Sequence, residues 1–212
     1  MESEYLEYKW EKPETNAHNY IVPEILKLIK EIDLSSDAKI LDAGCGGGNL
    51  VYTLYNIGFK NVYGFDASKS GIDLAKRSFP DLSNRFFIHN AYEPKLSTGI
   101  PEKYDVIVSM EVIEHLYSPK TYLANIYTWL NDDGYLILTT PYHGYLKNLT
   151  ITLLNKFDNH FNPLWEGGHI KFFSKGTMFN ILKDSGLKPI KFTGCGRIHY
   201  FWKSMVILCK KQ

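Results

Sequence analysis

The fold is decided by residues 39–50, which read KILDAGCGGGNL. The apolar residues up to Ala43 predict the end of a buried strand, the glycines from Gly44 to Gly48 predict a tight turn, and Asn49 predicts the start of a helix. Glycine allows positive φ and leaves no Cβ between the main chain and a ligand. A strand, glycine turn and helix in this order bind adenosine-containing cofactors at the carboxyl edge of a parallel sheet.

The spacing of the glycines distinguishes two classes of cofactor. A dinucleotide site requires Gly-x-Gly-x-x-Gly, and the third glycine of that pattern, counted from Gly44, falls on Asn49. An acidic residue, Asp42, stands two places before the first glycine. Its negative charge suits a cationic ligand better than a pyrophosphate. A nucleotide-dependent dehydrogenase is therefore the least favoured reading.

A second acidic residue strengthens this reading. Asp66 ends the apolar run from Val62 and lies 24 residues after Asp42. A carboxylate at the end of the second strand accepts hydrogen bonds from both ribose hydroxyls, because it carries acceptors only. The alternative is that Asp66 only caps the helix that begins near Ser68.

The pattern Asp-x-Gly-x-Gly-x-Gly over residues 42–48, together with Asp66, resembles the first two motifs of the class I S-adenosylmethionine-dependent methyltransferases. In that family the glycine turn wraps the methionine part of the cofactor. Many members carry an aspartate at the adenine contact where this chain has Asn90, whose amide offers both a donor and an acceptor. The resemblance implies that S-adenosylmethionine contacts the following residues: Asp42, Gly44, Cys45, Gly46, Gly48, Asp66, Ala67, Asn90, Ala91 and Met110.

The alternation of apolar runs and helical patterns predicts an α/β chain with a parallel sheet. Strands are expected near 38–43, 61–66, 85–89, 104–109 and 134–140, and helices near 48–58, 69–79, 119–130 and 174–185. Pro189–Thr193 and Met205–Cys209 are expected to pair as an antiparallel hairpin, because they lie too close for a helical crossover. The resemblance implies the Rossmann-like class I fold: a mostly parallel seven-stranded sheet with an antiparallel final strand and helices on both faces.

Residues 1–212 are predicted to form a single methyltransferase domain. Residues 1–33 are expected to be an N-terminal arm and a cap helix, and residues 141–173 a lid insertion over the substrate pocket. In the arm, Tyr8, Trp10 and Tyr20 either place a ring face against the sulfonium or the substrate, or simply pack.

Composition limits the possible partners and location. The 212 residues carry 24 basic and 23 acidic side chains, a net charge of +1 that favours neither nucleic acid nor an anionic membrane. The three cysteines, Cys45, Cys195 and Cys209, show no Cys-x-x-Cys spacing, which indicates a reduced, cytoplasmic protein. Neither a signal peptide nor a transmembrane segment is expected.

The fourth predicted strand is followed by residues that can carry chemistry. Glu111, Glu114 and His115 follow i, i+3, i+4 spacing, which places them on one face if a helical turn forms. Two carboxylates and an imidazole beside a cofactor act either as metal ligands or as acid–base groups. The alternative is a histidine that lines the pocket without any metal.

The sequence Glu-Val-Ile-Glu-His over residues 111–115 is similar to two branches of the family, the ubiquinone-biosynthesis O-methyltransferases and the small-RNA 3′-terminal 2′-O-methyltransferases. The resemblance implies a divalent cation such as Mg²⁺ held by Glu111, Glu114, His115 and His169. Such a metal would lower the pKa of the attacking hydroxyl. Without a metal, His115 or His143 would act as general base, so His115, His143 and Glu111 are the expected catalytic residues.

Residues 141–173 are rich in histidine and aromatic side chains, which indicates a substrate pocket. Leu146, Leu149, Leu153 and Phe157 follow helical spacing, and this helix is expected to be a lid rather than a dimer face or a membrane contact. The leading function is S-adenosylmethionine-dependent O-methylation of an aromatic or hydroxylated small molecule, with a homodimer possible. The alternatives are methylation of a terminal RNA ribose at its 2′ oxygen, and a non-catalytic S-adenosylmethionine-binding module.

Overall fold

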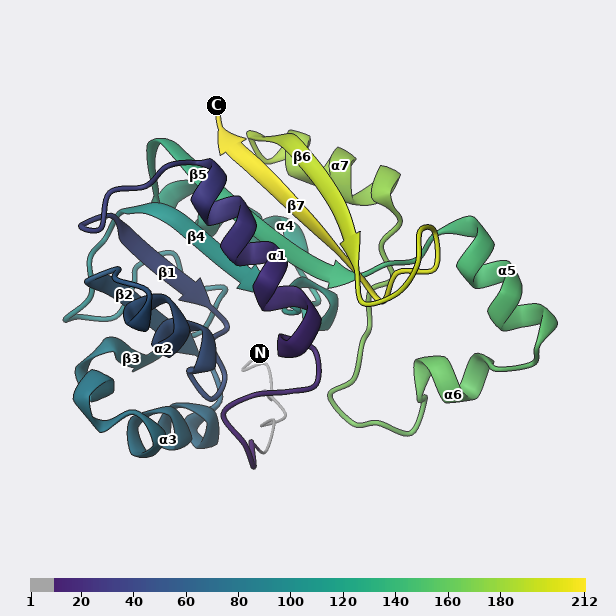
Figure 1. The fold of residues 1–212 in the computed structure, drawn as a ribbon, viewed down its shortest axis with the longest axis horizontal. Helices are drawn as coiled ribbons and strands as arrows, with labels where there is room; N and C mark the ends of the chain where they lie inside the picture. Colours follow the sequence, from purple (N-terminus) through teal and green to yellow (C-terminus); the bar gives the residue numbers. More distant parts are fainter. Residues whose placement is uncertain (1–9) are drawn as a thin grey trace.

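The computed structural model describes residues 10–212 and places a seven-stranded sheet at its centre, in the order β3-β2-β1-β4-β5-β7-β6 (Figure 1). The strands are β1 (Lys39–Ala43), β2 (Asn61–Asp66), β3 (Phe86–Ile88), β4 (Tyr104–Met110), β5 (Leu130–Pro141), β6 (Leu187–Cys195) and β7 (Ser204–Lys211). β7 runs antiparallel to both of its neighbours, whereas the pairings among β1 to β5 are parallel. The predicted sheet and its terminal hairpin are therefore confirmed.

Helices cover both faces of the sheet, as predicted. Apolar side chains of α1, α2 and α3 pack in one buried cluster, and those of α4 and α7 pack in a second cluster on the opposite face. The helices are α1 (His18–Glu31), α2 (Asn49–Asn56), α3 (Lys69–Ser78), α4 (Pro119–Trp129), α5 (Tyr145–Leu153), α6 (Phe157–Phe161) and α7 (Lys175–Asp184), with single 3₁₀ segments at η1 (Pro80–Arg85) and η2 (Ile113–His115). Because both faces are covered, the central strands β1 and β4 are almost wholly buried.

One predicted loop proved to be an irregular part of a strand. Asn131 to Gly134 read as a turn signal, yet they lie inside β5. Leu130 pairs with Tyr104, the register then shifts, and regular pairing with β4 resumes at Tyr135. Asp133 adopts φ of 64° there. The polar and glycine residues therefore form a bulge within the strand, which single-sequence patterns do not distinguish from a loop.

The strand order places the crevice of the sheet between β1 and β4. From β1 the chain proceeds to β2 and β3 on one side, and then crosses to β4 on the other side. In such sheets ligands bind beyond the carboxyl ends of the strands at this switch point. The residues that follow Ala43 and Met110 therefore flank the same crevice.

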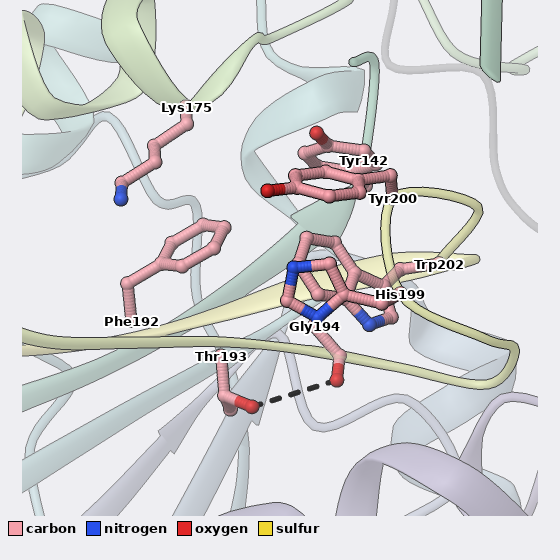
Figure 2. A pocket seen from close by; sticks show the side chains of 8 residues that line it. All are labelled: Tyr142, Lys175, Phe192, Thr193, Gly194, His199, Tyr200 and Trp202. Atoms are coloured by element: carbon pink, nitrogen blue, oxygen red, sulfur yellow. Dashed lines mark hydrogen bonds between the residues drawn. The ribbon is translucent and has the colours of Figure 1, made fainter. Parts of the chain in front are cut away.

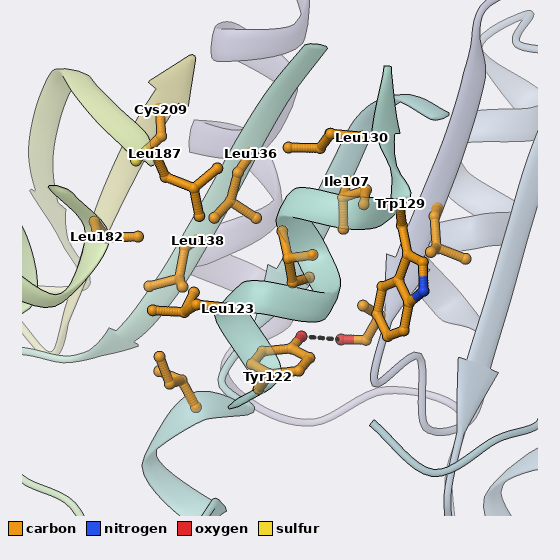
Figure 3. Close-up of a cluster of buried hydrophobic side chains, with 14 of the residues drawn as sticks. Ile107, Tyr122, Leu123, Trp129, Leu130, Leu136, Leu138, Leu182, Leu187 and Cys209 are labelled. Atoms are coloured by element: carbon orange, nitrogen blue, oxygen red, sulfur yellow. Dashed lines mark hydrogen bonds between the residues drawn. The ribbon is translucent and has the colours of Figure 1, made fainter. Parts of the chain in front are cut away.

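The second buried cluster holds the segment that follows β4 in place (Figure 3). Tyr122 on α4 is labelled in Figure 3, and its hydroxyl donates a hydrogen bond to Ser109 Oγ on β4 at 2.9 Å. Trp129, also on α4, donates from Nε1 to the carbonyl of Pro94 at 2.7 Å. α4 is thereby fixed against β4, and η2 lies in the short connection between them.

The segment between β5 and α7 extends beyond the end of the sheet and contains α5 and α6 (Figure 1). The predicted helix in this segment is present. Unlike an ordinary amphipathic helix, it buries a charged side chain and exposes an apolar one. The buried side chain of α5 is Lys147, which is 4% exposed, whereas Leu153 is 75% exposed. No helix in the described part of the chain combines the length and apolar character needed to cross a membrane.

Candidate active site

The glycine turn after β1 is fastened to the end of β2. The backbone amides of Gly44 and Cys45 both donate to the carbonyl of Phe65, at 2.8 and 2.9 Å. Gly44, Gly46 and Gly48 have φ of 89°, 49° and 83°, the region that favours glycine. These conformations bring the turn across the carboxyl ends of β1 and β2.

Two carboxylates lie behind this turn. Asp42 is 1% exposed, and its Oδ1 is buried without a hydrogen-bond partner in the described structure. Burial, together with the charge of Asp66, raises the pKa of Asp42 to about 8. A buried carboxyl group with an unpaired oxygen is stabilised by a cationic ligand, which is the type of ligand that the sequence predicted here.

Asp66 is held in a fixed orientation by backbone amides. Its Oδ2 accepts from the amide of Gly46 and its Oδ1 from the amide of Ser68, both at 2.8 Å. Burial raises the pKa of Asp66, and these hydrogen bonds, with one from Ala67, oppose the increase. Ser68, not Asp66, caps α3, because its side chain accepts from the amide of Gly71. The carboxylate of Asp66 retains acceptor capacity for a ligand hydroxyl.

The other predicted cofactor residues lie at the same edge of the sheet. Met110 ends β4, and Asn90 and Ala91 follow β3. Asn90 is exposed and its Oδ1 accepts from the amide of Tyr92 at 3.0 Å, while the carbonyl of Ala91 accepts from Asn125 Nδ2 at 2.9 Å. The adenine contact stays a prediction for Asn90, whose side-chain oxygen already has one donor.

The N-terminal arm packs on the glycine turn. A Cβ added to Gly46 would lie 2.2 Å from the indole ring of Trp10, so the ring covers this glycine directly. Tyr20, on α1, instead hydrogen-bonds Ser204, and burial raises its pKa. Tyr8 lies outside the described residues. Trp10 therefore packs on the turn, and a contact of its ring with the sulfonium or the substrate stays a prediction.

Glu111 follows β4 with φ of 56°, a left-handed conformation that is uncommon for glutamate. Its carboxylate accepts from the hydroxyls of Thr139 at 2.9 Å and Ser204 at 3.2 Å. Burial raises the pKa of Glu111 to about 7, and these two hydrogen bonds and the charge of Lys147 oppose the increase. The side chain is therefore fixed toward β5 and β7.

The 3₁₀ turn η2 begins only at Ile113, and Glu111 therefore does not share one helical face with Glu114 and His115, as the spacing predicted. The described residues that can jointly hold a metal ion are Glu114, His115 and His169, whose candidate ligand atoms all lie within 4.8 Å of one another. Glu111 is not part of this group. The left-handed backbone at Glu111 is the physical reason, because it turns the side chain away before the helical turn starts.

Glu114 is fully buried and accepts a hydrogen bond at Oε2 from Thr140 at 3.0 Å. Its Oε1 has no hydrogen-bond partner in the described structure and lies 4.0 Å from His169 Nε2. Burial, followed by the charge of Glu111, raises the pKa of Glu114. The carbonyl of Glu114 accepts from the amides of Ile170 and Lys171, at 2.9 and 3.0 Å, and so holds the His169 segment beside η2.

The ring of His115 has a defined tautomer. Its Nδ1 lies 3.0 Å from the carbonyl of Gly167 and 3.2 Å from that of Gly168. Because carbonyl oxygens only accept, Nδ1 carries the proton and Nε2 carries the lone pair of the neutral ring. Burial lowers the pKa of His115 and, to about 4, that of His169. Both rings are therefore neutral near pH 7, the state in which imidazole binds a metal or accepts a proton.

His143, the other predicted general base, is not a member of this group and lines a small cavity of about 210 Å³. Burial lowers its pKa to about 4, which makes it a weak base. The cavity is lined by Pro141, His143, Lys147, His160, Phe161, His169, Arg197 and Lys203. His169 therefore connects the candidate metal group with this cavity.

A second cavity, of about 500 Å³, opens between the end of β6, the start of α7 and the loop before β7 (Figure 2). Tyr142, Phe192, Tyr200 and Trp202 contribute aromatic rings, and Lys175 Nζ lies 4.4 Å from the centre of the Phe192 ring. Pro141 and His143 line the smaller cavity and Tyr142 lines the larger one, because successive residues of an extended chain point to opposite sides.

Sequence reasoning missed several residues of this region. Thr139, Thr140 and Ser204 orient the two glutamates, and Lys147 and Arg197 bring positive charge to the smaller cavity. Paired threonines at the end of a buried strand and a lysine within a short, leucine-rich helix were the available signals. Both are common without any function, so only their three-dimensional contacts make them informative.

Residues 14–191 match the family model described as a methyltransferase domain, and the chain belongs to that family. The predicted class of protein is thereby confirmed.

Individual relatives agree with this assignment. The chain is 30% identical over 162 residues to the mitochondrial ubiquinone biosynthesis O-methyltransferase of Schizosaccharomyces pombe, a match that covers 74% of this chain and 58% of that protein. It is 32% identical over 176 residues to the ubiquinone biosynthesis O-methyltransferase of Rickettsia bellii, covering 83% and 71%. The chain thus spans less than two thirds of the length of the S. pombe relative.

A solved structure shows the same fold. Magnesium protoporphyrin IX methyltransferase of Synechocystis PCC 6803 with bound SAH superposes with a TM-score of 0.67 over 91% of this chain and 82% of that one. At 20% identity this likeness concerns the fold alone.

Proposed function

We propose that the protein transfers a methyl group from S-adenosylmethionine to an oxygen atom of a small hydroxylated acceptor. The observation that carries the proposal is the position of two different sites around one crevice. The unpaired Asp42 and the oriented Asp66 lie at the ends of β1 and β2, and Glu111, Glu114 and His115 follow β4, which neighbours β1. The two relatives described as O-methyltransferases support oxygen as the methylated atom.

The residues at the cofactor edge fit S-adenosylmethionine. The positive φ values of the glycine turn and the absence of Cβ atoms leave the main chain accessible, and Asp42 supplies a buried carboxyl group with an unpaired oxygen, whose ionised form a cationic ligand would stabilise. Asp66 offers lone pairs to a pair of ribose hydroxyls. When bound, the cofactor supplies an activated methyl group, and the protein's main contribution is then to position the acceptor oxygen.

At the acceptor edge, Glu114, His115 and His169 would hold a divalent cation. The unpaired Oε1 of Glu114 and the lone pair of His115 Nε2 are suitable donors. Two imidazoles among three ligands favour Zn²⁺, Fe²⁺ or Mn²⁺ over the predicted Mg²⁺, which prefers oxygen ligands. A bound cation would lower the pKa of an acceptor hydroxyl. In its absence, Nε2 of His115 is the atom that accepts the hydroxyl proton.

The segment of residues 141–173 is proposed to act as a lid over the acceptor. Its contacts support this role, since the amides of Ile170 and Lys171 bond to the carbonyl of Glu114 while α5 and α6 extend away from the sheet. A homodimer and a cytoplasmic location stay predictions.

The proposed function is tested by binding and turnover together. Calorimetry is expected to show binding of S-adenosylmethionine and its demethylated product but no binding of NAD. A panel of hydroxylated aromatic compounds is expected to yield a product heavier by one methyl group. Binding of NAD in place of S-adenosylmethionine would contradict the proposal. Binding without any turnover on small molecules or on RNA would instead indicate the non-catalytic module.

The metal is tested separately from turnover. Zn²⁺, Mn²⁺ and Mg²⁺ are titrated into chelator-treated protein by calorimetry, and Glu114→Gln and His169→Ala are each expected to weaken binding of the preferred ion. Asp73→Asn is the matched control, because it removes an exposed carboxylate on α3, outside the group, and its binding of the ion is expected to be unchanged. Equal affinity in all four proteins would reject these ligands.

A further inference from the structure

The smaller cavity carries positive charge that no ion pair neutralises. Among its lining residues, Lys147, Arg197 and Lys203 are cationic at neutral pH, and the lining includes no carboxylate. None of these three cations takes part in an ion pair among residues 10–212. The acidic group that acts on Lys147 is Glu111, which does not line the cavity, so cations outnumber acidic groups there and the cavity attracts an anion.

Lys147 is the least expected member of the set, because buried lysines are rare and costly. Its Nζ donates to the carbonyl of Tyr142 at 2.8 Å and to that of Lys203 at 3.4 Å, neither of which is charged. Burial and the charge of Arg197 lower the pKa of Lys147 to about 8, so that the ammonium form still predominates near pH 7. An ammonium group has three donors, and two are used in these hydrogen bonds.

His143 provides a second, independent observation. The side chain is 7% exposed, and neither of its ring nitrogens makes a hydrogen bond of good geometry in the described structure; the neighbouring polar side chain is that of Asn148. Its ring is stacked on Phe161 with centroids 5.6 Å apart, and this contact fixes its plane. Leaving a buried imidazole without a good hydrogen bond costs stability. A ligand in this cavity that hydrogen-bonds to His143 would remove that cost.

We propose that this cavity is an anion subsite that binds a carboxylate or phosphate group carried by the methyl acceptor. His169 lines the cavity and also belongs to the candidate metal group, so an acceptor held here presents its remaining part beside Glu114 and His115. The volume of about 210 Å³ admits only the anionic end of a larger molecule. That volume corresponds to about seven water-sized groups. The inference rests on the proposed function and narrows its substrate class to acidic hydroxylated compounds.

The test uses matched ligands of different charge with the full chain and saturating S-adenosylhomocysteine. Benzoate and phenyl phosphate probe the carboxylate and the phosphate, and benzamide is the neutral control. Calorimetry is expected to show that at least one anion binds about 10–100-fold more tightly than benzamide, as hydrogen bonds to charged groups imply. The tighter of the two anions identifies the group that the subsite prefers.

Variants locate the binding. Arg197→Ala combined with Lys203→Ala changes two exposed side chains of the cavity wall and is expected to remove most of the preference for the anion. Lys183→Ala combined with Lys188→Ala removes the same charge from exposed positions that do not line the cavity, and is expected to leave the preference unchanged. Lys147 is left intact because it also holds the backbone of Tyr142.

Three results would overturn the inference: equal affinity for benzamide and both anions, an unchanged preference in the cavity variant, or an equal loss in the two double variants. In each case S-adenosylhomocysteine binding is measured in the same protein. Retained binding of that product means that the subsite alone is wrong. If the unmodified protein does not bind S-adenosylhomocysteine, the proposed function itself is rejected.

Discussion

The cofactor edge and the acceptor edge of this crevice are built in different ways. The cofactor edge is formed largely by consecutive residues of β1, the glycine turn and the end of β2, and its contacts are mainly backbone ones. The acceptor edge brings side chains from η2, β5, α5, the residues before α7 and the β6–β7 loop to one place. A locally encoded site is recognisable in the chain, whereas an assembled site depends on how distant segments pack.

The largest expected effect concerns the acceptor edge alone. His115→Ala removes the imidazole whose Nε2 carries the lone pair and whose Nδ1 is held by the carbonyls of residues 167 and 168. We expect turnover to fall by about 10²–10⁴-fold, the usual contribution of a positioned base. Affinity for S-adenosylhomocysteine, measured by calorimetry, is expected to stay unchanged. A parallel loss of affinity would mean that the two edges are not independent.

Asp66→Ala tests the opposite edge. We expect the affinity for S-adenosylmethionine to fall by about 1–3 kcal/mol, because bound hydroxyls lose a charged partner. The backbone amides of Gly46 and Ser68 also lose their acceptor, so the thermal stability of the protein without cofactor is measured alongside. Asp73→Ala, on the exposed side of α3, serves as the control. Unchanged calorimetric affinity would refute the ribose contact.

Gly46→Ala tests whether the arm and the turn are coupled. The added Cβ would enforce a strained left-handed residue, at a cost of about 1–2 kcal/mol, and would overlap the ring of Trp10. We expect a lower unfolding free energy in urea. In the double variant with Trp10→Ala, the unfolding free energy lost to overlap with the ring is expected to be recovered. The loss caused by the strained backbone is expected to remain. Full additivity of the two substitutions would show that Trp10 does not pack on the turn in solution.

The smallest expected effect is a pH dependence at Asp42. Its pKa is raised to about 8 in the folded protein, whereas an unfolded aspartate titrates near 4, so the folded state keeps the proton longer. Stability contributed by this group therefore falls as pH rises through that window. We expect Asp42→Asn to gain about 1 kcal/mol over the unmodified protein, without cofactor, between pH 7 and pH 8 in urea titrations. A constant difference between the two proteins would contradict the raised pKa.

The same contrast explains which predictions held. The strands, the terminal hairpin and the positions of the helices followed from apolar periodicity, because each pattern is complete within one short segment, whereas the placement of helices on both faces was implied by the family resemblance. The predicted face of Glu111, Glu114 and His115 was wrong for Glu111, because its left-handed backbone depends on contacts with Thr139 and Ser204 from other strands. The burial of Lys147 in place of the leucines of α5 likewise follows from contacts with the carbonyls of Tyr142 and Lys203.

The sequence by itself determined the α/β class, the position of the glycine turn and the two aspartates beside it, since these depend on local periodicity and on backbone conformations that only glycine adopts readily. Tertiary structure alone decided which of the glutamates and histidines meet, and that cations gather around a buried His143. The physical reason is that burial and charge compensation are properties of neighbours in space. Such neighbours can be far apart along the chain, so a local sequence pattern does not reveal them.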